Sequence, residues 1–80
     1  MIAKNIFKEL GYDDYDKSYS AILYINSKEN IRIWFDTIEK TVEKCKQTST
    51  SAFDIQKIPI TFNEIKAINR QIIELEKEVE

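Results

Sequence analysis

The chain has 80 residues, of which 42% are hydrophobic and 32% are charged, a composition that fits one small globular domain rather than a disordered chain. Its formal net charge of −2 at pH 7 argues against a general affinity for nucleic acids. Because Cys45 is the only cysteine and the chain has no histidine, an intrachain disulfide and an ordinary zinc site are both excluded.

The first predicted element is a short amphipathic helix over residues 2–10. Its apolar residues recur at helical spacing, and Lys4 and Lys8 lie on the opposite side. Gly11 follows at once, and a glycine in the left-handed conformation commonly satisfies the last carbonyl groups of a helix. The apolar stripe comprises Ile2, Ile6, Phe7 and Leu10.

Residues 12–20 are predicted to form an acidic loop. Asp13, Asp14 and Asp16 raise the question of a calcium site, which needs alternating oxygen ligands, a glycine for the sharp turn and a distal glutamate. The glycine is missing, so we expect a solvated connector and no metal.

Residues 19–26, YSAILYIN, are rich in aromatic and β-branched side chains and are predicted to form a strand. Alternation places Ala21, Leu23 and Ile25 on one face of this strand. Ile22 and Tyr24 lie on the other face.

Residues 31–46, IRIWFDTIEKTVEKCK, fit two structures. A helical period aligns six apolar side chains, although Ile33 falls outside that stripe. A period of two gives a β-hairpin, favoured by the many β-branched residues and by Asp36, whose side chain can bond its own backbone in a turn. The pattern alone leaves both structures open. The helical stripe would be Ile31, Trp34, Phe35, Ile38, Val42 and Cys45.

The C-terminal segment predicts a helix of about 18 residues. Pro59 favours an extended residue before it, and Thr61 with Glu64 has the spacing of a capping box. Four glutamates in the last turns oppose the helix dipole. We therefore expect residues 76–80 to fray in the free protein, or to be held by a cationic surface of a partner. The predicted core stripe is Ile65, Ile68, Ile72, Leu75 and Val79; the acidic residues are Glu74, Glu76, Glu78 and Glu80.

Three segments resemble a group of small, uncharacterised accessory proteins of phages and prophages of low-GC Gram-positive bacteria. The segments are NIFKELGY, KTVEK and PITFNEIKAINRQIIELE, and the chain departs from the usual ELGW ending by running on as ELEKEVE. The resemblance implies an N-terminal helix, a strand pair around the KT turn and a closing helix, and so favours the hairpin. A turn at 37–40 would pair Phe35 with Val42, Ile33 with Lys44 and Trp34 with Glu43.

The expected fold is therefore a single α+β domain over residues 1–80. We expect an antiparallel sheet made of strands 20–25, 31–36 and 41–46, with both helices packed on one of its faces. In an alternative form of this sheet, residues 52–58 add a fourth strand at the edge. Ile31, Ile33, Phe35 and Val42 are expected to face the helices. The candidate partner surface comprises Ile22, Tyr24 and Trp34 on the other face, with Glu74, Glu76 and Glu78 on the last helix. The alternative for Trp34 is a half-buried position against Tyr15 and Tyr19.

Catalysis is not expected. The chain lacks histidine and has no glycine-rich phosphate loop, and Lys44 and Lys46 on a strand would point away from the Cys45 thiol. No stretch approaches the roughly 20 apolar residues that span a bilayer. We expect a cytoplasmic, cofactor-free protein of a bacterial host cell that binds a host or phage protein, with inhibition of a defence protein as one form of this. A nucleic-acid-associated regulator, a structural phage component and a homodimer remain alternatives.

Overall fold

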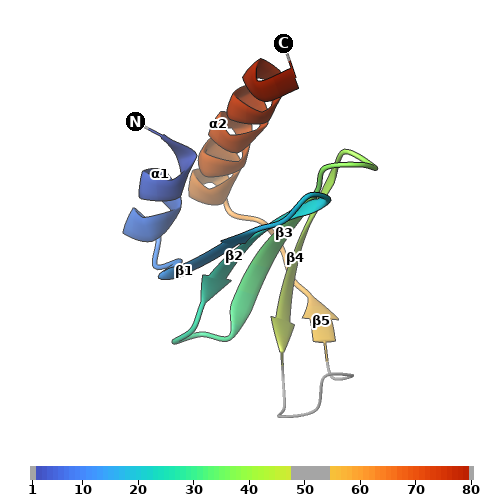
Figure 1. The fold of residues 1–80 in the computed structure, drawn as a ribbon. Coiled ribbons are helices and arrows are strands. Elements are labelled where there is room, and N and C mark those ends of the chain that lie inside the picture. Colours follow the sequence, from blue (N-terminus) through green and yellow to red (C-terminus); the bar gives the residue numbers. More distant parts are fainter. Residues whose placement is uncertain (1, 48–54, 80) are drawn as a thin grey trace.

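The computed structural model describes residues 2–47 and 55–79, with side chains as far as Lys77. Within these residues the chain forms two helices and one antiparallel sheet, so the predicted α+β class is confirmed (Figure 1). The sheet has five strands rather than three or four. The elements are α1 (Ala3–Glu9), β1 (Asp14–Lys17), β2 (Ala21–Asn26), β3 (Ile31–Asp36), β4 (Thr41–Gln47), β5 (Ile55–Lys57) and α2 (Phe62–Val79).

The predicted hairpin over residues 31–46 is confirmed, with the expected register. Phe35 pairs with Val42, and Trp34 pairs with Glu43. Its turn forms locally: Asp36 Oδ1 accepts hydrogen bonds from the backbone N–H groups two and three residues later, at 3.0 and 2.9 Å, and Lys40 has a φ of 58°. The strands follow one another in the order β1 to β5, each antiparallel to the next.

The prediction of a loop over residues 12–20 was wrong, because β1 pairs with β2 along Asp14–Lys17. The packing of Tyr15 accounts for the formation of this strand. Its ring packs 5.0 Å from the ring of Tyr24, and the Lys4 ammonium lies 4.9 Å above it. Strand β5 confirms the predicted edge strand over Ile55–Lys57, while residues 52–54 lie outside the described residues.

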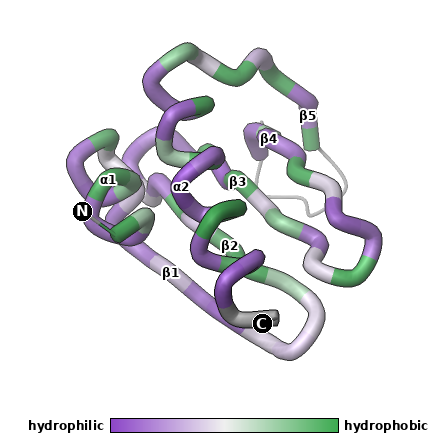
Figure 2. The backbone as a smooth tube through the Cα atoms, turned by 90° about the horizontal axis from the view of Figure 1, so that it is seen from above, coloured by the Kyte–Doolittle hydropathy of each residue, from purple (hydrophilic) through white to green (hydrophobic). Residues whose placement is uncertain are grey.

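Both helices lie on one face of the sheet, as predicted, and they are side by side (Figures 1 and 2). Ile33 and Phe35 are buried beneath them, and Ile31 and Val42 pack against the same core. The buried cluster comprises Ala3, Phe7, Tyr12, Ile22, Tyr24, Ile33, Phe35, Ala67 and Ile68.

Ile22 and Tyr24 were predicted to lie on the face away from the helices, and this was wrong. The four-residue turn over 27–30 pairs Ile22 with Phe35 and Tyr24 with Ile33. Because cross-strand partners share a face, both side chains enter the core with exposed fractions of 0% and 1%.

Helix α1 ends in a glycine cap, as the sequence predicted. Gly11 has a φ of 101°, its N–H donates to the carbonyl of Lys8, and the N–H of Tyr12 donates to the carbonyl of Phe7 at 3.0 Å. The Phe7 and Tyr12 rings meet edge to face, 5.6 Å apart. These two bonds and the ring contact make a Schellman motif, which leads the chain from α1 into β1.

Replacing Gly11 by alanine should lower the free energy of unfolding by about 1–2 kcal/mol, because a Cβ is strained at this φ. It would also lie 3.2 Å from Asn26 Nδ2. Urea unfolding measures the loss, with Asn5→Ala on the exposed side of α1 as the control, expected within about 0.5 kcal/mol of wild type. Equal stability of the Gly11 variant would contradict the cap.

Helix α2 begins as predicted, with a capping box. The Thr61 N–H donates to Glu64 Oε1 at 2.9 Å, and the Glu64 N–H donates to Thr61 Oγ1 at 3.2 Å. The helix runs for 18 residues. In the structure it continues to Val79, whose side chain lies outside the described residues, and fraying of residues 76–80 in solution stays a prediction.

The predicted core stripe of α2 is divided between two sides of the helix. Ile68 is buried and Leu75 packs on the core, but Ile65 and Ile72 remain 41% and 38% exposed. The buried side instead includes two polar residues, Glu64 and Gln71.

Candidate functional site

The sheet face turned away from the helices carries no described helix or strand (Figure 1). We call it the open face. Alternation along the strands places the side chains of Leu23, Ile25 and Trp34 there, together with Cys45. Trp34 is 42% exposed, and the other three are half-buried. An aromatic side chain with aliphatic neighbours therefore forms the centre of a solvent-facing surface.

The strand register arranges this surface in rows. Leu23 and Glu43 flank Trp34 on the neighbouring strands, and Asp16 follows on β1. In the next row Ile25, Arg32, Cys45 and Lys57 lie side by side, with Asp14 at the β1 end.

The two edges of the open face differ in charge. The β1 edge carries the exposed carboxylates of Asp14 and Asp16. At the other edge Lys57 Nζ lies 3.4 Å from Glu43 Oε1, and both side chains are well exposed. Such an exposed pair contributes little to stability, so its charges stay available to a partner. The result is an apolar centre with an acidic edge on one side and a mixed edge on the other.

The structure does not bring the predicted partner residues together. Of the three sheet residues, only Trp34 lies on the open face, because Ile22 and Tyr24 are in the core. Glu74 is half-buried: its Oε2 accepts a hydrogen bond from the Ala3 N–H at 2.7 Å and lies 3.3 Å from Arg70 Nε, so it joins α1 to α2. Glu76 is exposed on α2, and the side chain of Glu78 lies outside the described residues.

Leu23 and Ile25 were missed as surface residues. The signal was present in the sequence, since a four-residue turn at 27–30 fixes which side of β2 faces Phe35. The turn at 27–30 is also stabilised locally by two asparagines. Asn26 Oδ1 accepts a hydrogen bond from the Glu29 N–H at 3.1 Å, and Asn30 has a φ of 56°.

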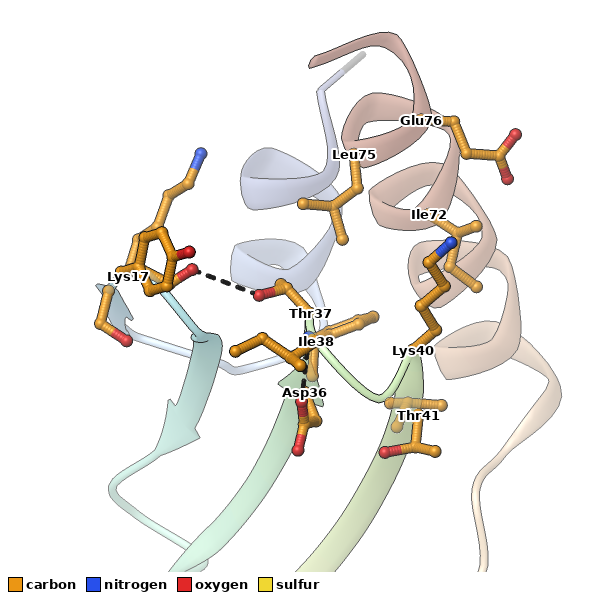
Figure 3. A pocket seen from close by; sticks show the side chains of 13 residues that line it. Lys17, Asp36, Thr37, Ile38, Lys40, Thr41, Ile72, Leu75 and Glu76 are labelled. Carbon is orange, nitrogen blue, oxygen red and sulfur yellow. Dashed lines mark hydrogen bonds between the residues drawn. The ribbon is translucent and has the colours of Figure 1, made fainter. Parts of the chain in front are cut away.

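A groove opens at the end of the sheet, between α2 and the turn that joins β3 to β4 (Figure 3). Its volume is about 930 Å³. Ile72 and Leu75 on α2 lie across from Ile38 on the turn. The polar groups that line this groove stabilise the neighbouring turns. Asp36 caps the β3–β4 turn, and Thr37 Oγ1 donates a hydrogen bond to the Tyr19 carbonyl at 3.4 Å. The further lining residues are Lys17, Ser18, Phe35, Lys40, Thr41, Val42 and Glu76.

A polar cluster lies inside the protein, around Glu64. Tyr12 Oη donates to its Oε2 at 2.5 Å, and Lys44 Nζ donates to its Oε1 at 2.6 Å. Glu64 and Lys44 are 7% and 8% exposed. The ion pair therefore links β4 to α2 in the interior, and the Tyr12 hydrogen bond adds the loop after α1, all out of reach of a large substrate.

The pKa values of Glu64 and Tyr12 are both shifted away from neutral pH. Burial by itself would raise the pKa of Glu64, but the hydrogen bonds from Lys44, Thr61 and Tyr12, together with the Lys44 cation, outweigh it and lower that pKa. The pKa of Tyr12 is raised by burial first, and by its bond to Glu64 second. The carboxylate is therefore ionised and the phenol neutral, which suits a structural rather than a proton-transferring group.

Residues 2–47 and 55–79 contain no cluster of three or more acidic or cysteine side chains that could hold a metal ion. Neither helix in this part of the chain is long and apolar enough to cross a membrane. No protein-family model, curated protein or solved structure significantly matches the chain. Its class is thus set by the fold: a small α+β protein with two helices on one face of a five-stranded meander and an aromatic residue on the other.

Proposed function

We propose that this protein acts by binding another protein through the open face, centred on Trp34. The supporting observation is a 42% exposed tryptophan among aliphatic neighbours on a sheet face that no described element covers. Protein interfaces favour such an aromatic anchor in a desolvated centre with charged residues at the rim. The acidic β1 edge of Asp14 and Asp16 favours a partner whose apolar patch has cations on one side.

The biological setting rests on the sequence resemblance, which supports an accessory protein of phage or prophage origin in the bacterial cytoplasm. Inhibition of a host or defence protein fits a small acidic binder of this kind. The positions of two carboxylates support a function without catalysis: Glu64 is buried in an ion pair, and Asp36 caps its own turn.

One observation favours a second candidate, binding of single-stranded nucleic acid. Arg32 is exposed two residues before Trp34 on the same face of β3, and Lys57 also lies on this face. A base could therefore stack on the indole while the two cations meet phosphates. The carboxylates of Asp14, Asp16 and Glu43 on the same face oppose it. Titration with an oligonucleotide at low and moderate salt tests this candidate, which predicts binding with a steep salt dependence.

Trp34→Ala should weaken partner binding by at least about 30-fold, the effect of losing an interface anchor worth about 2 kcal/mol. Proteins captured from a bacterial lysate by the wild-type chain should be lost with this variant and kept with Ile38→Ala, whose exposed side chain lines the groove beside α2. A purified captured protein should then shift the fluorescence of Trp34, the only tryptophan in the chain. Equal capture by both variants, or an unchanged emission on binding, would refute the proposed surface.

A further inference from the structure

Helix α2 has a second apolar side, which faces away from the core. We call it the outer stripe. Its first members, Phe62 and Ile65, are 85% and 41% exposed, and Ile72 and Ile73 are 38% and 44% exposed. Figure 1 shows α2 extending away from the sheet, and no described helix or strand covers this side, although the β3–β4 turn lies across a groove from Ile72. Asn69, also exposed, lies between the two apolar pairs.

Part of the outer stripe is symmetric along the helix, because Ile65 and Ile73 each lie four residues from Asn69. Its positions follow steps of three and four, the spacing with which two helices pack against each other. Asn69 is at the midpoint, with Ile65 on one side and Ile72 and Ile73 on the other. An antiparallel second copy would therefore place isoleucine against isoleucine. It would also bring the two Asn69 amides together, and each amide can donate one hydrogen bond to the other and accept one.

The charged residues on the exposed side of α2 also favour an antiparallel pairing of two α2 helices. Lys66 lies in the first half of α2, one turn after Phe62, and Glu76 continues the stripe in the second half. In an antiparallel pair Lys66 comes within reach of Glu76 of the second copy, and this contact is made twice. A parallel pair instead places Glu76 against Glu76, which is repulsive.

We propose that two copies of this chain associate through the outer stripe of α2 in an antiparallel, twofold-symmetric dimer. This inference goes beyond the proposed function and is independent of it, because the open face lies on the other side of the sheet. The stripe is about 15 residues or roughly 22 Å long, a small interface, so the dimer exchanges readily with monomers.

Sedimentation equilibrium over a range from about 1 μM to 1 mM tests the association, since this range spans the affinities of small interfaces. The apparent mass should rise from 9.5 kDa towards twice that value. Ile73→Glu should raise the dissociation constant at least about tenfold, because it places a charge in the apolar contact. Ile55→Glu is the matched control, 58% exposed on the edge strand β5, and should dimerise as wild type does. A monomer at the highest concentration, or equal losses in both variants, would overturn the proposal.

Cysteine cross-linking tests the direction. In a Cys45→Ser background, oxidised Asn69→Cys protein should form a disulfide-linked dimer, since the two positions meet at the twofold axis. Phe62→Cys should not link to itself, but should link to Glu76→Cys when the two proteins are mixed. Self-linking of Phe62→Cys would show a parallel pair and contradict the inference. Trp34→Ala should dimerise unchanged, so failure of the dimer and failure of the open face are separate results.

Discussion

Replacing Glu64 by glutamine should lower the free energy of unfolding by about 3–5 kcal/mol, the cost of leaving a buried charge unpaired. Lys44 is 8% exposed, and Glu64 Oε1 lies 2.6 Å from its ammonium. A glutamine keeps the shape and one acceptor oxygen but cannot neutralise that cation. A domain of this size is stabilised by about 4–12 kcal/mol in total, so the variant should approach the limit of stability. Urea unfolding at pH 7 measures the change.

Lys44→Met provides the matched control. It removes the cation and leaves Glu64 with hydrogen bonds from Tyr12 and Thr61, so its cost should be smaller. The double variant should lose less than the two single losses added together, since neither charge is then left alone in the interior. Additive losses would show that the two residues act independently and would contradict the ion pair.

The same pair predicts a dependence of stability on pH. The pKa of Glu64 is lower in the folded protein than its ordinary value of 4.5. Its contribution to stability is therefore fully present above about pH 4.5 and is lost as the pH falls through the lower, folded-state value. The difference in unfolding free energy between wild type and Glu64→Gln should narrow as the pH falls below 4.5. A constant difference down to strongly acidic pH would contradict this.

Replacing Phe7 by alanine should lower the free energy of unfolding by about 3–5 kcal/mol, through lost burial and the cavity left behind. The Phe7 side chain is 0% exposed. Its ring stacks on Tyr24 with a centroid distance of 3.9 Å, and it meets Tyr12 and Phe35 edge to face. This side chain supplies a fully buried aromatic contact between α1 and the sheet, so its loss should release α1 first.

Thermal unfolding and amide hydrogen exchange measure the effect of Phe7→Ala, with early loss of protection expected in α1. Phe62→Ala is the control for the same chemical change at an 85% exposed site. At concentrations where the chain is monomeric, it should change stability by no more than about 0.5 kcal/mol. Similar losses in both variants would mean that burial in the aromatic cluster does not anchor α1.

The elements that the sequence predicted well are those defined by neighbours in the chain. The cap at Gly11, the capping box of Thr61 with Glu64, and the turn begun by Asp36 each involve atoms no more than about five residues apart. The register of the 31–46 hairpin followed from its turn. Of the candidate surface, only Trp34 was placed correctly on the open face, because its position depends on that hairpin alone.

Three features were decided by contacts between distant segments: strand β1, the buried side of β2, and the orientation of α2. Strand β1 depends on Tyr15 packing against Tyr24, a contact that an acidic sequence does not reveal. The buried side of β2 depends on its register with β3, which moved Ile22 into the core and Leu23 to the surface.

The orientation of α2 shows most clearly what local pattern leaves open. Hydrophobic spacing selected Ile65 and Ile72 for the core, yet the helix buries Glu64 and Gln71 instead. Both polar side chains find partners on other elements: Lys44 and Tyr12 bind Glu64, and Tyr24 Oη donates to Gln71 Oε1. The sequence by itself determined the two helices and their caps, because those depend on short-range bonds, whereas the choice of a hairpin over a helix at 31–46 rested on the family resemblance. Only the tertiary structure decided which sides are buried, because a polar group enters a core when a distant residue satisfies it.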